Sequence, residues 1–182
     1  MNIGMIVLGA ILASICVLPF VAAGISKKKL SKRVEAMLRA LMLEHKASSS
    51  KEELVGRMAI ALDESQSMLF FVKKHTDRND LIAVRMTEMK SCKLEKESRT
   101  VTNDNGSYQL IESLILRFMP VKQGASEVCV PIFKIEDDLH MNDELALAER
   151  WSAIVDEQLR LRVPLQAVGK DQLPPKQLKA SA

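Results

Sequence analysis

The chain has 182 residues, of which 27% are charged and 47% are hydrophobic, and its formal net charge at pH 7 is +3. The charge is segregated, because residues 26–51 carry +6, residues 52–162 carry −5 and residues 163–182 carry +2. Since nucleic-acid binding needs concentrated positive charge, the acidic central segment argues against a nucleic-acid partner. Once an apolar N-terminal segment is subtracted, about 155 residues remain, which suffices for one ordinary domain.

The first segment with a clear interpretation is apolar and long. Residues 3–25 contain no Asp, Glu, Lys, Arg or His. A hydrocarbon core about 30 Å thick needs roughly 20 helical residues to cross it, so this segment predicts a transmembrane anchor over residues 1–26. Basic residues tend to stay in the cytoplasm. The cluster that follows therefore places the N-terminus outside the cell (inner) membrane and the remaining chain in the cytoplasm, with these residues facing the lipid bilayer: Lys27, Lys28, Lys29, Lys32 and Arg33.

A cleaved secretory signal peptide is the alternative interpretation of the same segment. The small residues Ala22 and Ala23, after Val21, resemble a cleavage site. However, no Lys or Arg precedes the apolar run, and the run exceeds the usual length of about 7–15 residues. An uncleaved single-pass anchor is therefore favoured, and a secreted or periplasmic protein remains the alternative.

Residues 28–46 predict an amphipathic helix within a basic juxtamembrane region of residues 27–50. Residues 47–50, Ala-Ser-Ser-Ser, end the pattern and indicate a linker. The helix could form a coiled-coil stalk that makes a homodimer, or lie on the membrane or against the domain. Fewer than three heptads of pattern fall short of what a coiled coil requires. The apolar stripe consists of Leu30, Val34, Met37, Leu38 and Leu41.

From residue 54 the pattern changes to short runs of β type that are separated by turn residues. Turns are predicted at residues 63–67, 77–80 and 121–126, and a loop tip at residues 102–107. Pro131 cannot donate to a strand ladder, so the last run is predicted to be an edge strand or to contain a bulge. The six predicted strands cover residues 58–62, 68–72, 82–86, 89–94, 110–119 and 128–133.

One helix is predicted after the strands, over residues 143–162. Asn142 is suited to cap its N-terminus, and Pro164 predicts that the helix ends before it. Residues 163–182 are polar and lack periodicity, which predicts a disordered tail. The apolar stripe of the helix consists of Leu147, Ala148, Trp151, Ile154, Val155 and Leu159. Trp151 is the largest of these residues and is predicted to have a structural role.

Consecutive antiparallel strands followed by one C-terminal helix are the element order of a pleckstrin-homology-like barrel. The predicted fold class is therefore α+β, with a transmembrane helix, a juxtamembrane helix and a mainly antiparallel barrel over residues 51–162 that the last helix caps. Three segments, residues 69–74 (Leu-Phe-Phe-Val-Lys-Lys), 89–92 (Met-Lys-Ser-Cys) and 132–151, resemble a pattern in uncharacterised bacterial membrane-anchored proteins. This resemblance covers about residues 3–160 and implies architecture and location, but no activity.

The sequence contains no motif for phosphate binding, dinucleotide binding, zinc proteolysis or serine hydrolysis. Glu136, Asp137 and Asp138 with His140 could hold a divalent metal, but such a loop before a helix more often caps and solvates that helix. His75, followed by acidic residues, is similarly interpreted as part of a solvated hairpin. The cysteines lack metal-site spacing and indicate free, buried thiols, with a Cys92–Cys129 disulfide only if the signal-peptide alternative holds. No cofactor and no metal site are predicted.

These observations predict a non-enzymatic interaction module rather than a catalyst. The leading function is an adaptor or assembly protein that displays a protein-binding surface at the membrane. The alternative is a domain that senses anionic lipid, with residues 27–33 and the pair Lys73 and Lys74 facing headgroups. The partner edge and its adjoining loop are predicted at Val130, Pro131, Asp137, Asp138 and His140.

Overall fold

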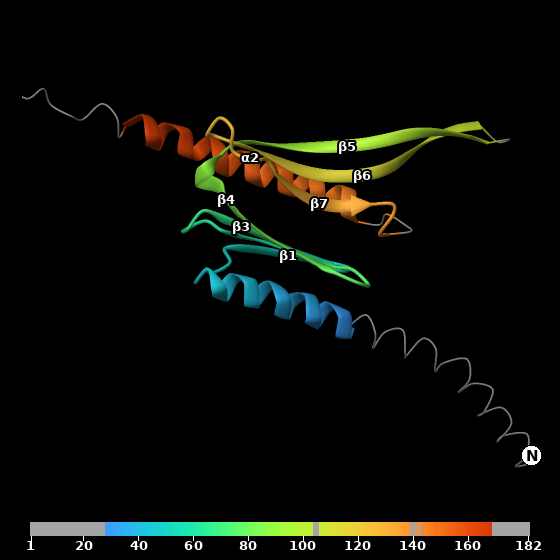
Figure 1. Cartoon of the computed structure of the whole chain (residues 1–182), viewed down its shortest axis with the longest axis horizontal. Helices are drawn as coiled ribbons and strands as arrows, with labels where there is room; N and C mark the ends of the chain where they lie inside the picture. Colours follow the sequence, from blue (N-terminus) through green and yellow to red (C-terminus); the bar gives the residue numbers. More distant parts are fainter. Residues whose placement is uncertain (1–27, 104–105, 139–140, 142, 169–182) are drawn as a thin grey trace, which may run out of the picture. The chain divides into compact units, whose positions relative to one another are not determined.

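The structure, a computed structural model, describes residues 28–103, 106–138, 141 and 143–168. The chain divides into two compact units, one that ends at Val84 and one that begins at Arg85 (Figure 1). The predicted anchor, residues 1–26, lies outside the described residues. Within the part of the chain that is described, no helix combines the length and the apolar character that crossing a bilayer requires.

The first unit consists of a helix and a four-stranded sheet. The helix covers residues 28–44 and confirms the helix that the apolar stripe predicts. The strands follow one another in the sheet in the same order as in the sequence, so neighbours in the chain are neighbours in space. They are β1 (Lys51–Val55), β2 (Met58–Asp63), β3 (Met68–Lys74) and β4 (Asn79–Arg85).

The apolar stripe of the 28–44 helix packs on one face of this sheet. Val34 and Leu38 are fully buried, and they belong to one hydrophobic cluster with Phe70 and Val72 of β3. Leu30, Met37 and Leu41 are partly buried against the same cluster. The stripe that a coiled-coil dimer would need is therefore covered by the chain's own sheet, as in the alternative in which the helix lies against the domain.

The two central strands, β2 and β3, are buried on both faces. Ala59 and Ala61 of β2 face the helix, whereas Met58, Ile60 and Leu62 alternate with them and are equally buried. Lys73 on β3 is only 1% exposed. Lys73 therefore cannot face lipid headgroups, and that part of the lipid-sensing prediction is wrong because a dense apolar strand carries this lysine into the interior.

The predicted linker, residues 47–50, is held against the sheet by hydrogen bonds. The backbone N–H of Ser48 donates to Oδ2 of Asp63 at 2.8 Å, and the N–H of Ser50 donates to the carbonyl of Leu62 at 2.8 Å. Asp63 also accepts from the Ser65 hydroxyl at 2.6 Å and from the Gln66 N–H at 3.0 Å, which builds the predicted turn between β2 and β3. One buried carboxylate thus ties the linker and the turn together.

The second unit is a three-stranded sheet with one long helix. Its order is β5-β6-β7, and both neighbouring pairs are antiparallel. β5 and β6 are each 15 residues long, whereas β7 has seven. The elements are the 3-10 helix η1 (Met86–Glu88), β5 (Met89–Asn103), β6 (Gly106–Pro120), β7 (Val128–Lys134) and α2 (Glu144–Val168).

The helix α2 packs against all three strands of this sheet (Figure 1). Trp151 is 1% exposed, so its predicted structural role is confirmed. Leu114, Leu116 and Phe118 supply fully buried side chains from β6. Among the α2 residues with described burial, the buried apolar ones are Leu147, Ala148, Trp151, Val155 and Leu159, which is the predicted stripe apart from the half-buried Ile154.

Several boundaries differ from the sequence predictions. The strands form two separate sheets rather than a closed barrel, so α+β with two antiparallel sheets and a C-terminal helix is the confirmed part of the fold. β1 was not predicted, because Lys51–Val55 is polar and half-exposed. β5 continues past the predicted end at residue 94 through residues 95–103, which were not predicted because they are mostly polar and exposed. α2 continues past Pro164, so the predicted helix end at residue 162 is wrong; a proline removes one N–H donor and opposes a helix without always ending it.

Replacing Leu38 by alanine tests the packing of the 28–44 helix on its sheet. Leu38 is fully buried, so Leu38→Ala should lower the free energy of unfolding of the full chain by about 2–5 kcal/mol. Leu43→Ala on the same helix is the matched control, because Leu43 is 78% exposed and its loss should cost less than about 0.5 kcal/mol. Urea unfolding followed by circular dichroism measures both, and equal effects would contradict the packing.

The Asp63 carboxylate should make the stability of the first unit pH-dependent. Burial alone would raise its pKa, but the hydrogen bonds from Ser65, Gln66 and Ser48 outweigh burial and hold the pKa below 3.8. Because the folded pKa is depressed, its contribution is present above about pH 4 and is lost as the pH falls through the folded pKa.

Asp63→Asn should therefore destabilise the full chain by about 1–3 kcal/mol at pH 7. The difference from the natural chain should shrink as the pH falls below about 4. Urea unfolding at pH 7 and pH 3 measures this difference. Glu64→Gln is the control, because Glu64 is exposed and loses a surface ion pair with Lys51 at 3.2 Å, which should cost less than about 1 kcal/mol. A pH-independent loss would show that the charge of Asp63 is not what matters.

Candidate protein-binding surface

The predicted partner edge lies on β7, which is an edge strand of the second sheet. Pro131 faces Ile115 of β6, and a register shift between Leu114 and Ile115 adds an extra residue to β7 at this point. Both predicted consequences of Pro131, an edge position and a bulge, are therefore confirmed. A proline is tolerated here because only one side of β7 has a strand to pair with.

The side chains of β7 alternate between the core and the surface. Val130 is fully buried, so this predicted edge residue packs inside and offers no side chain to a partner. Cys129 is exposed and Pro131 is half-buried, so these two residues carry the surface character of the strand. Lys134, at the end of β7, is half-buried as well.

A tight turn follows β7 and presents the predicted acidic residues. The backbone N–H groups of Asp137 and Asp138 both donate to the carbonyl of Lys134, each at 3.0 Å. Both aspartates are half-buried. His140, the third residue predicted for this loop, lies outside the described residues. The residues that are described contain no group of three or more His, Cys, Asp or Glu that could hold a metal ion.

An ion-pair network that the sequence analysis missed crosses the three-stranded sheet. Arg117 of β6 donates from Nε and Nη2 to both oxygens of Glu95 on β5, each at 2.7 Å. Its Nη1 also donates to Oε2 of Glu127, just before β7, at 2.7 Å. Arg117 faces Cys129 across the ladder, so the network lies on the same face as the exposed thiol.

The ion pairs shift the pKa values of Arg117 and Glu95 in the directions that stabilise their charges. The hydrogen bond to Glu95, and then that to Glu127, raises the pKa of Arg117, while the hydrogen bond from Arg117 lowers the pKa of Glu95. Arg117 and Glu95 therefore stay charged at neutral pH, and their two hydrogen bonds join β6 to β5. A single arginine inside the apolar run Leu-Ile-Leu-Arg-Phe-Met was the signal that could have indicated this network.

A shallow hollow of about 260 Å³ lies where β7 ends and the β5–β6 hairpin continues. Ser113 at its base is 6% exposed and donates from Oγ to Oε2 of Glu97 at 2.8 Å. Glu112 is paired with Arg99 at 2.9 Å. The hollow is thus built from structural polar contacts, and its lining consists of Glu97, Glu112, Ser113, Ile115, Lys134, Ile135 and Glu136.

The two described cysteines have opposite surroundings. Burial raises the pKa of the Cys92 thiol to about 12, with a smaller contribution from the negative charge of Asp156. A thiol with this pKa is almost entirely protonated at neutral pH and is a poor nucleophile. Cys129 is an exposed free thiol, and Cys16 lies outside the described residues. Both described cysteines are free thiols, but only Cys92 is buried, so the prediction of buried thiols is wrong for Cys129.

The two described histidines take part in packing contacts. Nε2 of His75, in the turn that follows β3, lies 2.9 Å from Oδ2 of Asp80 at the start of β4. The ring of His45 lies 5.6 Å from the ring of Phe70, centroid to centroid. His75 therefore lies in the predicted hairpin loop, but its side chain is only 9% exposed, so the prediction that it is solvated is wrong.

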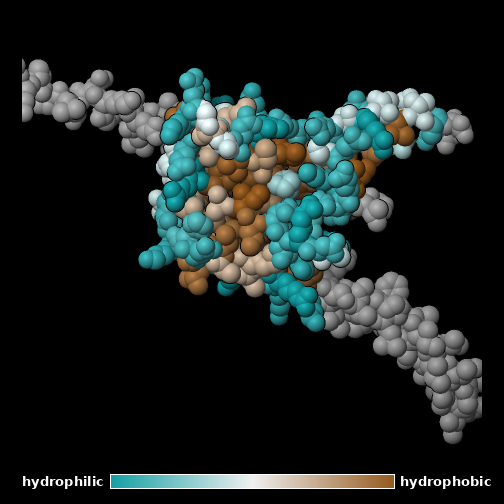
Figure 2. All heavy atoms as spheres, in the orientation of Figure 1, coloured by the Kyte–Doolittle hydropathy of each residue, from teal (hydrophilic) through white to brown (hydrophobic). Residues whose placement is uncertain are grey.

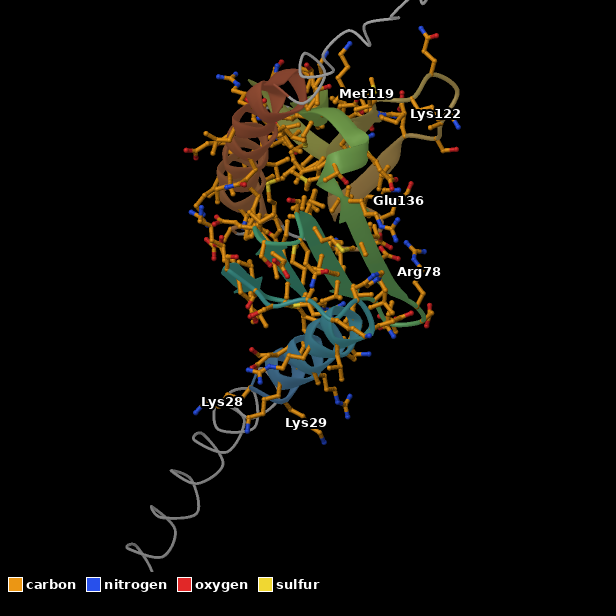
Figure 3. The ribbon with its side chains drawn as sticks, turned by 90° about the vertical axis from the view of Figure 1, so that its left-hand side faces the viewer. Lys28, Lys29, Arg78, Met119, Lys122 and Glu136 are labelled. Atoms are coloured by element: carbon orange, nitrogen blue, oxygen red, sulfur yellow. The ribbon has the colours of Figure 1, made fainter. Side chains whose placement is uncertain are left out.

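The basic residues after the predicted anchor gather at the start of the 28–44 helix. Lys28, Lys29, Lys32 and Arg33 are all exposed, and Lys27 lies outside the described residues. Figure 3 shows the side chains of Lys28 and Lys29 pointing away from the ribbon at this end of the helix. The opposite stripe of the same helix packs on the sheet, so the basic residues remain on its outer side.

Comparisons with known proteins return no match for this chain: no family model, no curated protein and no solved structure is similar to it. The resemblance to membrane-anchored bacterial proteins stays a prediction.

Proposed function

We propose that the protein is a non-catalytic adaptor or assembly module, held at the cell membrane by residues 3–25 with its two units in the cytoplasm. The observation that carries this proposal is the outer side of β7, an edge strand with the exposed residue Cys129 and the half-buried residue Pro131. The turn with Asp137 and Asp138 follows directly. A partner that docks there would contact the free edge of β7 and the acidic turn that follows it.

The docking mode follows from the chemistry of β7. Pro131 lacks an N–H donor, so a partner strand could not form an uninterrupted ladder along this edge. The partner would instead contact the side chains of Cys129 and Pro131 and the carboxylates of the turn. A partner segment with apolar residues and a few basic residues suits this combination, since it complements an acidic loop beside an apolar edge.

The order of the secondary-structure elements supports a binding role. Four strands in sequence order, three further strands and a C-terminal helix are also the element order of the pleckstrin-homology-like class, although the two sheets do not close into a barrel. Modules of this class bind peptides at an open sheet edge or beside the C-terminal helix. Fold does not determine function, so this support is by analogy.

The non-catalytic part of the proposal rests on how the ionisable groups are used. Arg117, Glu95 and Glu127 are engaged with one another across the sheet. Cys92 has a pKa raised to about 12, which is opposite to the shift that a nucleophile needs. These groups therefore contribute to structure rather than to acid–base or nucleophilic chemistry.

Crosslinking the tagged full chain in its native membrane, followed by mass spectrometry, tests the adaptor role. A recurrent membrane partner should be captured, and Cys129→Lys should lower its recovery about tenfold, because a lysine on an edge strand opposes docking. Ser98→Lys is the matched control, since Ser98 is an exposed residue on β5 at the other edge of the same sheet. Recovery of the protein alone, or equal losses in both variants, would overturn the proposal.

Anionic-lipid sensing is the second candidate, and the exposed group Lys28, Lys29, Lys32 and Arg33 favours it. Each basic residue near an anionic surface contributes about 1 kcal/mol, and salt screens this attraction. A chain that begins at residue 27 should therefore bind vesicles that contain phosphatidylserine and release them in 0.5 M salt. Replacing the four residues by glutamine should abolish binding, whereas salt-independent binding would contradict this candidate.

A further inference from the structure

The far half of the β5–β6 hairpin projects beyond the rest of the second unit as a two-stranded ribbon (Figure 1). β7 pairs with β6 only from Ser113 to Phe118, and the N–H of Ile135 adds one bond to the carbonyl of Glu112 at 2.9 Å. Between Gly106 and Ile111, β6 pairs with β5 on one side, and no described strand pairs with its other side. An isolated two-stranded ribbon is marginally stable in water, so this segment lacks the support that a third strand would give.

The free edges of the second sheet differ in how they are protected. Natural proteins block edge pairing with charges or proline. The β7 edge carries Pro131, whereas residues 107–111 of β6, Ser-Tyr-Gln-Leu-Ile, contain neither charge nor proline. The unpaired stretch of β6 is therefore the one unprotected edge among the described strands of this sheet. The β5 edge carries Lys90, Lys93, Glu95, Lys96, Glu97 and Arg99.

This unprotected edge is also partly apolar and exposed. Tyr108 is 50% exposed, and Leu110 and Ile111 are half-buried. Tyr108 faces Val101 and Leu110 faces Arg99 across the ribbon, so Tyr108 and Leu110 share one face. Figure 2 shows brown spheres among pale and teal ones on the projecting arm. A strand added at this edge would cover Tyr108 and Leu110 and satisfy the free backbone groups.

The sequence of the edge is complementary to itself. In an antiparallel pairing centred on Gln109, Tyr108 of each copy lies opposite Leu110 of the other, and Ser107 lies opposite Ile111. Glu112 then faces Gly106, so no like charges meet. Aromatic and aliphatic pairs directly opposite each other are the pairs that stabilise antiparallel sheets. A second copy therefore supplies the apolar complement of this edge without bringing like charges together.

We propose that two copies of the chain associate through β6, with residues 106–112 of each forming an antiparallel pair about a two-fold axis at Gln109. The ribbons then form one four-stranded sheet in the order β5-β6-β6-β5. One face of this sheet carries Val101, Tyr108 and Leu110, and the other carries Thr100 and Gln109. The interface is isologous, so it closes at two copies. It uses none of the β7 residues in the proposed partner surface.

Disulfide trapping in the full, membrane-bound chain tests this pairing directly. In a background without Cys16, Cys92 and Cys129, Gln109→Cys places two thiols across the axis, where Cα atoms lie about 4.5–5.5 Å apart. Mild oxidation should give a covalent dimer. Thr100→Cys is the matched control, because Thr100 faces Gln109 on the same ribbon but would be separated from its counterpart by three strand spacings, about 14 Å. Thr100→Cys should remain monomeric.

A second substitution distinguishes specific pairing from random collision. Leu110→Lys, added to the Gln109→Cys chain, should lower the trapped fraction about tenfold, because it removes both apolar pairs and charges the edge. Ser98→Lys should leave the trapped fraction unchanged. Cys129→Lys, in a Gln109→Cys chain whose residues 106–112 are otherwise natural, should leave it unchanged as well. Circular dichroism establishes that the variants fold. Equal trapping at residues 100 and 109, or trapping that survives Leu110→Lys, would overturn the proposal without affecting the adaptor role.

Discussion

The pairing of β5 with β6 is the interaction on which the second unit depends. Its register runs from Met89 opposite Pro120 to Asn103 opposite Gly106, with two register shifts on the way. One face of the paired strands provides the buried residues Leu114, Leu116 and Phe118, against which α2 can pack. β7 pairs with β6 on the side of β6 that faces away from β5. The positions of α2, β7 and the projecting ribbon therefore all depend on this one hairpin.

A difference in strand length accounts for the unusual part of the second unit. β5 and β6 have 15 residues each and β7 has seven, so β7 can cover only one half of β6. In the covered half, Arg117 crosslinks neighbouring strands through Glu95 and Glu127. In the uncovered half, β6 pairs with β5 alone and carries the exposed Tyr108. The same hairpin is thus a structural scaffold at one end and an open edge at the other.

The first unit was largely predictable because its apolar periodicity is strong. The stripe through Val34 and Leu38 predicted the 28–44 helix, and the dense run at residues 68–72 predicted β3. The polar half of β5 was not predicted, because residues 95–103 are stabilised by pairing with β6 rather than by burial. The side chains there alternate without an apolar face, which leaves no sequence signal of a strand.

The site residues show the same limit. Pro131 could be assigned to an edge from its missing N–H alone, since that is a local property. The burial of Val130 and Lys73 could not be assigned, because burial depends on which face of a strand meets the core. The Arg117 network joins residues that are 22 and 10 positions apart, and only the register of the sheet brings them together.

Two kinds of open edge on one sheet imply two kinds of contact. β7 is interrupted by Pro131 and followed by an acidic turn, so contacts there must rely on side chains and tolerate a partner of unrelated sequence. The free stretch of β6 has uninterrupted backbone groups and few distinctive side chains, so contacts there must rely on the ladder and on a matching strand. Backbone pairing is restricted by register, and register is satisfied most simply by an identical strand about a two-fold axis. The two proposals therefore assign self-association and partner binding to opposite ends of the same three-stranded sheet.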